Sequence, residues 1–201
     1  MSSLEDAGLR DRLSDINEIY GNRLDAIGEY YKSLTGRSRV FSDADAAITE
    51  ALITFDTSRV ANKVALYTDD LSRTLMNQIV TGEQPTVGEL VSQFGEATAA
   101  NIQTELNTAV AGFSRSITQK KAKDLGFDLF IYLGPDDDVT RPFCEARVNK
   151  IWDTQQIATW DNGTNLPAAQ YGGGYNCRHD LRPLSEERAK QLIESGQAER
   201  G

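Results

Sequence analysis

The residue types that most often bind metals or act as nucleophiles are few in this chain and lie close together near its C-terminus. The chain has two cysteines and one histidine, which are Cys144, Cys177 and His179. Cysteine and histidine are the preferred protein ligands of zinc, and a structural zinc takes four ligands in tetrahedral geometry. The sequence therefore predicts a metal site in which a carboxylate, such as Asp138 or Asp180, or a water supplies the fourth ligand.

Other interpretations of the same residues stay open. The two cysteines could be free buried thiols, or they could form a Cys144–Cys177 disulfide, which a reducing compartment disfavours. A bound zinc places the two sulfurs about 4 Å apart, and a disulfide places them about 2 Å apart. A third interpretation makes Cys177 a nucleophile with His179 and Asp180 as base and partner. Adjacent side chains rarely point the same way, and no oxyanion-hole glycine motif accompanies them.

The segment "GGGYNCRH" precedes and includes two of the predicted ligands. No Lys-Ser/Thr follows the glycines, so they are not a phosphate-binding loop. We expect them to adopt turns that side chains forbid and so to bring Cys177 back to Cys144. We further expect Asn176 to bond the nearby backbone, and Arg178 to point toward the acidic residues at 136–138. Arg141 is expected to pair with a carboxylate or, less simply, to hold a phosphate.

Composition limits the classes of partner. The net charge is −9 and the isoelectric point about 4.7, which excludes a general polyanion binder. One basic run predicts either a helix end, which is the simpler interpretation, or a weak local DNA contact. This run consists of Arg115, Lys120, Lys121 and Lys123. No apolar segment is long enough to cross a membrane, and we expect a soluble protein made in a reducing compartment.

The elements that must position these residues divide the chain at about residue 125. Residues 1–125 show apolar side chains at three- and four-residue steps, which predicts long helices. We expect Ser42 to cap one helix, with a break near Thr57-Ser58. A further helix begins after "TGEQP", where Thr86 and Glu89 have capping-box spacing, and it ends at Gly126.

Residues 126–201 have a different pattern. "FDLFIYL" predicts a strand, and "ARVNKIW" predicts a hairpin with its turn at Asn149-Lys150. An irregular loop follows over 160–175, and a short helix capped by Ser185 ends at Gly196. The predicted fold class is therefore α+β, with a long-helix N-terminal region and a small, irregular β-containing C-terminal domain.

Several short motifs of the C-terminal region occur in a familiar order. "LFIYLGPDDDVTRPFCEARVNKIW" followed by "GGGYNCRHDLRP" resembles the C-terminal domain of phage minor head proteins, the Mu F-like head morphogenesis family. The resemblance covers about residues 127–184, and the aspartate at the family's spacing is Asp137. Cys144 stands where other members have His, and His179 stands where they have Cys. Because both residue types bind zinc, the resemblance implies that these positions bind a metal.

The resemblance implies a non-enzymatic protein of a tailed-phage head, made in the host cytoplasm and present in the virion in multiple copies. Its expected partner is the portal protein or the major capsid protein, contacted in part through the long helices. The alternative is a metal-dependent nuclease or phosphodiesterase that uses His179, Asp180 and Arg141.

Overall fold

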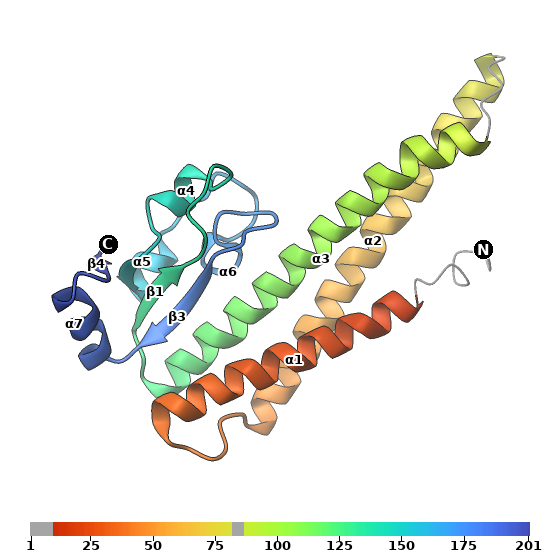
Figure 1. The fold of residues 1–201 in the computed structure, drawn as a ribbon. Helices are drawn as coiled ribbons and strands as arrows, with labels where there is room; N and C mark the ends of the chain where they lie inside the picture. The colour runs from red at the N-terminus through yellow and green to blue at the C-terminus, as the bar shows by residue number, and fades with distance from the viewer. Residues whose placement is uncertain (1–9, 82–86) are drawn as a thin grey trace.

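The computed structural model describes residues 10–81 and 87–201 and confirms the α+β class. Three long helices come first, and the strands and short helices follow them (Figure 1). The helices are α1 (Arg10–Thr35), α2 (Asp43–Thr81), α3 (Val87–Leu125), α4 (Pro142–Glu145), α5 (Thr154–Ala158), α6 (Ala168–Tyr171) and α7 (Glu186–Glu194). The strands are β1 (Leu129–Leu133), β2 (Lys150–Asp153), β3 (Asp180–Leu184) and β4 (Glu199–Arg200).

The three long helices pack around their own apolar cluster. Tyr20 of α1 stacks on Phe113 of α3 with ring centroids 4.4 Å apart, and Ile117 is buried beside them. Beyond this cluster α2 and α3 continue side by side as an arm that extends away from the sheet (Figure 1). The helical N-terminal region therefore both supports the C-terminal part and projects past it.

The predicted break near Thr57-Ser58 is wrong, because α2 is continuous there. Hydroxyl and β-branched residues weaken a helix only slightly, and tertiary contacts override that preference. On the inner face of this turn Val60 is buried, and Asp56 accepts a hydrogen bond of 3.0 Å from the hydroxyl of Tyr20. The predicted capping box at Thr86 and Glu89 involves a residue outside the described part of the chain.

The other predicted helix ends are confirmed. The backbone N–H of Ser42 donates to the Asp45 carboxylate at 2.7 Å, and the N–H of Asp45 donates back to Ser42 Oγ at 3.4 Å. Gly126 closes α3 with φ +78°, a left-handed conformation that glycine adopts at low cost. Ser185 caps α7 by accepting from the N–H of Arg188, and Gly196 follows that helix with φ +69°.

The sheet has the order β3-β1-β2-β4, so the first strand lies in its centre. β1 pairs antiparallel with both neighbours, and β4 adds to β2 in parallel. Side chains of β1 alternate between two faces, as strand geometry requires. Phe130 and Tyr132 pack toward the long helices, whereas Leu129 and Ile131 pack with Ala189 of α7. The predicted strand is therefore confirmed, and both of its faces are buried.

The predicted hairpin over "ARVNKIW" is wrong in its first half. Residues 146–149 are a turn that follows α4, and the N–H of Val148 bonds back to the carbonyl of Cys144 at 2.8 Å. Only the second half is a strand, and β2 pairs with β1, with Ile151 opposite Ile131. Asn149 does occupy a turn, with φ +60°. The loop over 160–175 is irregular as predicted, apart from the short α6.

A buried ion pair joins the start of α2 to the end of α3. The Asp45 side chain is almost fully buried, and its carboxylate accepts from Lys121 Nζ at 2.6 Å and from Lys120 Nζ at 2.7 Å. Burial by itself raises the pKa of the Asp45 carboxyl, but the hydrogen bonds from Lys120 and Lys121 outweigh it. The pKa therefore lies well below its ordinary value of 3.8.

We expect Asp45→Asn to lower the free energy of unfolding by about 3 kcal/mol at neutral pH, because Lys121 stays buried without its closest carboxylate. Folding favours ionised Asp45, so this stabilisation is present above the ordinary pKa of 3.8 and is lost as the pH falls toward the folded-state value. Urea denaturation followed by circular dichroism measures both effects.

Asp43→Asn is the matched control for this substitution. Asp43 lies in the same first turn of α2 as Asp45 and pairs at 3.0 Å with Arg39, which precedes the helix, but its side chain is fully exposed. Exposed pairs contribute little, so the free energy of unfolding should barely change. Equal destabilisation by the two substitutions would contradict the role assigned to the buried pair.

Candidate metal centre

The structure brings three of the four predicted ligands together. The Cys144 and Cys177 sulfurs lie 3.8 Å apart, and His179 Nδ1 lies 3.9 Å from the Cys177 sulfur. One donor atom from each residue lies within 4.8 Å of the others, and all three residues are buried. The sulfurs are free thiols at the separation predicted for a shared metal, and not at that of a disulfide. This group could hold a metal ion.

The three residues come from two separate segments. Cys144 lies on α4, a single turn that begins with Pro142, a residue favoured at the first helical position. Cys177 and His179 lie on the extended segment that leads into β3. The pairing of β3 with β1 therefore carries these two residues back to the loop that follows β1.

Tyr132 of β1 also belongs to the centre. Its hydroxyl lies 3.3 Å from the Cys144 sulfur and 3.6 Å from the Cys177 sulfur. Its ring stacks on the His179 ring, with centroids 5.3 Å apart and planes 7° apart. Tyr132 was not predicted as a site residue, although the alternation along β1 places it on the same face as Phe130 and so toward the interior.

The glycine run forms turns and also lets its backbone approach the two sulfurs closely. Gly172 and Gly174 have φ of +54° and +95°, as predicted for glycine-specific turns. A Cβ on Gly172 would lie 2.8 Å from the Cys177 sulfur, and a Cβ on Gly173 would lie 2.6 Å from the Cys144 sulfur. The N–H of Gly173 donates to the Cys177 sulfur at 3.2 Å. The glycines therefore let the backbone contact both sulfurs directly.

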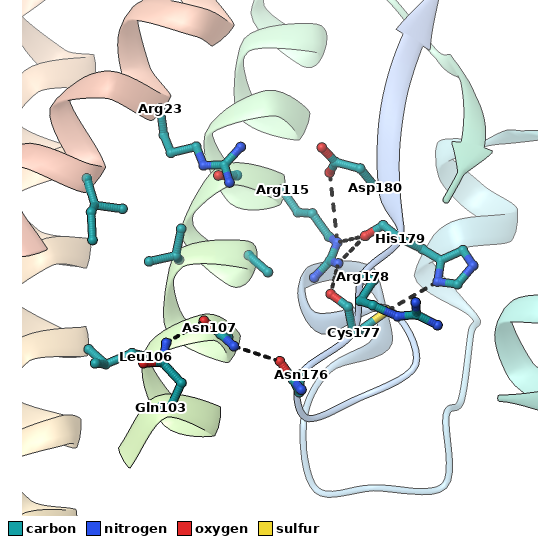
Figure 2. Close-up of a pocket in the computed structure, with 14 residues that line it drawn as sticks. Arg23, Gln103, Leu106, Asn107, Arg115, Asn176, Cys177, Arg178, His179 and Asp180 are labelled. Carbon is teal, nitrogen blue, oxygen red and sulfur yellow. Dashed lines mark hydrogen bonds and ion pairs between the residues drawn. The ribbon is translucent and has the colours of Figure 1, made fainter. Parts of the chain in front are cut away.

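Arg115 of α3 holds the segment that carries two of the ligands. Its guanidinium is buried and donates to the carbonyls of Cys177, at 3.1 Å, and of His179, at 3.0 Å from Nε. A third bond of 3.1 Å reaches the carbonyl of Gln170. Figure 2 shows this side chain reaching from α3 to the segment that carries Cys177 and His179. The Asp180 carboxylate lies on the Arg115 side of that segment, and the His179 ring lies on its other side.

This position corrects the interpretation of the basic run. Arg115 and Lys121 are interior residues, and Lys120 is bound to Asp45 and Asp124. From the sequence, Arg115 was predicted to belong to a helix end or to a DNA contact. A single sequence does not show which face of a long helix other segments cover. The predicted DNA contact gains no support from these residues and stays a prediction.

The acidic residues proposed as fourth ligand lie elsewhere. Asp138 is exposed at the tip of a turn and does not belong to the group of three. The Asp180 carboxylate accepts from the N–H of Leu181 at 3.0 Å and faces Arg115 at 3.9 Å. It therefore points away from the cluster, as expected for neighbours in an extended segment.

The side chains around the ligands partly follow the predictions. Arg178 binds both carboxylate oxygens of Asp137, at 2.8 and 2.6 Å, which confirms its predicted direction. Arg141 donates to the carbonyl of Tyr175 at 2.7 Å, and not to a carboxylate as predicted. Asn176 has φ +53° and bonds α3: its side-chain Oδ1 accepts from Asn107 Nδ2 at 3.0 Å, and its backbone N–H donates to Thr108 Oγ1 at 2.8 Å. The expected local backbone bond of Asn176 is therefore wrong.

The two thiols share a hydrogen bond that separates their pKa values. The hydrogen bond with Cys144 lowers the pKa of the Cys177 thiol, and the charge of Arg115 and nearby backbone N–H groups act in the same direction. The same hydrogen bond, together with burial, raises the pKa of the Cys144 thiol. Within the described chain, the buried Nε2 of His179 has no hydrogen-bond partner. The hydrogen bond between the thiols therefore favours a thiolate at Cys177 next to a protonated Cys144, and a negatively charged sulfur suits a cation.

Comparison with known proteins adds no family assignment, since no family model, no curated protein and no solved structure matches the chain. The resemblance over residues 127–184 therefore stays a prediction. In the structure, the separate motifs of this resemblance meet at the group of Cys144, Cys177 and His179.

We expect Gly173→Ala to lower the free energy of unfolding by about 1–3 kcal/mol, because the new methyl group collides with the Cys144 sulfur in a packed site. Urea denaturation followed by tryptophan fluorescence reports on this region, since both tryptophans, Trp152 and Trp160, lie in the C-terminal part. Gly21→Ala is the control, because nothing lies within 4 Å of its added Cβ. A Gly173→Ala variant as stable as this control would contradict the close approach.

Proposed function

We propose that this protein is a non-enzymatic structural component of a tailed-phage head that acts in head morphogenesis. One observation carries the proposal: the motifs that resemble the phage minor head family are far apart in sequence yet converge on a single buried centre. The centre contains Cys144 from one motif and Cys177 and His179 from another. Around it, Asp137 of the first motif binds Arg178 of the second.

The long helices supply the surface for assembly in this proposal. The arm of α2 and α3 projects beyond the sheet (Figure 1), and Phe55 and Leu66 of α2 are exposed on 60% and 59% of their surface. The proposed partner is the portal protein or the major capsid protein, with multiple copies of the chain in each virion. The proposed place of synthesis is the host cytoplasm. No helix in the described chain is long and apolar enough to span a membrane.

Zinc is the metal that we propose for the centre, in a structural role. Two cysteine sulfurs and an imidazole are the donor set that zinc prefers among common biological cations. A cation between them would join the loop after β1 to the segment before β3, and binding energy of this kind contributes to folding. The two segments that carry these ligands contain few other apolar residues, so a cross-link between them would contribute to their stability.

The nuclease alternative has less support from the geometry. It requires His179, Asp180 and Arg141 to act on one substrate, but the Asp180 carboxylate faces Arg115 and the His179 ring faces the sulfurs (Figure 2). The two side chains therefore point to different sides of the segment. No contact in the described chain favours a hydrolytic assignment over the structural one.

The structural proposal predicts that the chain is found in assembled heads. Proheads and virions of a phage that encodes it, purified on density gradients, should contain it in several copies by quantitative mass spectrometry. An abundant host protein serves as the control for contamination. A chain that is abundant in infected cells but absent from both particles would overturn the proposal.

The zinc proposal predicts about one bound zinc per chain in protein purified without chelators. Cys144→Ser should lose the metal and destabilise the C-terminal part, as read by tryptophan fluorescence, while circular dichroism shows the helices still folded. Asp138→Asn is the matched control and should keep its zinc, because this exposed residue lies outside the group. Metal-free wild-type protein, or zinc retained by Cys144→Ser, would contradict the proposal.

A further inference from the structure

A small cavity opens next to the cluster. Its volume is about 200 Å³, and Cys144, Cys177 and His179 all line it. Arg141 and Arg178 line the same cavity, together with Val139, Thr140 and Asn176. A ligand of a few non-hydrogen atoms could therefore enter beside the donor atoms.

The described chain offers no acidic fourth ligand on this side. Asp138 is exposed outside the group, and Asp180 faces Arg115. The Tyr132 hydroxyl contacts both sulfurs, but Tyr132 does not line the cavity. Sites with three protein ligands commonly keep the fourth position for water or another small ligand.

The charges around the cavity favour an anion. A divalent cation, two thiolates and a neutral imidazole sum to zero, so the cluster itself does not neutralise the nearby arginines. Arg178 is neutralised by Asp137, which it binds through two hydrogen bonds. Arg141 has no carboxylate partner in the described chain, and the Tyr175 carbonyl, which fixes its position, occupies only one of its nitrogens. The cavity is therefore bordered by one uncompensated cation.

We propose that the Cys144–Cys177–His179 centre leaves one metal coordination position open toward this cavity, and that a carboxylate anion, held by the Arg141 guanidinium, binds there. Guanidinium groups match carboxylates in both charge and geometry. This inference rests on the metal site proposed above and adds its ligand. The carboxylate comes either from a small free anion or from an acidic side chain of a partner that inserts into the cavity.

The test uses the full chain loaded with Co²⁺ in place of zinc, because cobalt absorbs visible light and its spectrum reports on its ligands. Acetate is titrated at constant ionic strength. We expect a saturable change in the visible spectrum, and a dissociation constant for acetate about tenfold higher in Arg141→Gln, which loses a charge-assisted hydrogen bond. Arg188→Gln removes the same charge from the exposed face of α7 and should leave the constant unchanged.

A second titration uses a short glutamate peptide with blocked ends. A response to both ligands supports access for a partner's side chain, whereas a response to acetate alone supports a free anion. A cobalt–thiolate spectrum that neither ligand changes would overturn this inference alone, and absence of that spectrum would overturn the metal site as well. Tyr132→Phe provides the remaining check, because an anion response seen only in this variant would make Tyr132 the fourth ligand and overturn the inference.

Discussion

The buried guanidinium of Arg115 is the interaction on which the rest of the structure depends. It lies on α3, yet its hydrogen bonds end on the carbonyls of Gln170, Cys177 and His179. A buried arginine is costly unless its donors are satisfied, and here three backbone carbonyls satisfy them. The long helix therefore sets the position of the segment that carries two of the three proposed metal ligands.

The third ligand is supported from the opposite side by aromatic packing. The Arg147 guanidinium lies 3.9 Å from the centroid of the Phe143 ring, and Phe143 packs edge-on against Trp160. These contacts brace the turn that holds Cys144, which buries its sulfur against Tyr132 and Gly173. Arg115 of α3 therefore supports the segment of Cys177, and aromatic packing around Phe143 supports the turn of Cys144.

This arrangement explains how one chain can combine a compact centre with a long arm. The C-terminal part is joined to α3 through Arg115 and through Asn176, which bonds both Asn107 and Thr108. The start of α2 is joined to the end of α3 by the buried Asp45. The base of the helical arm is therefore joined to the centre by direct side-chain contacts.

The sequence by itself determined the elements whose signals are local. The helical region, the strand at β1, the caps at Ser42 and Ser185 and the ends at Gly126 and Gly196 follow from hydrophobic period, capping chemistry and glycine conformation. The scarcity of cysteine and histidine also singled out Cys144, Cys177 and His179. The tertiary structure decided the features that depend on distant segments. Arg115 is interior because the segment before β3 covers that face of α3. Asp138 is excluded because it lies exposed in a turn outside the group of three, and the hairpin fails because β1 is the partner of β2. A single sequence carries the local preference of each residue, but which surfaces cover one another follows from packing the whole chain.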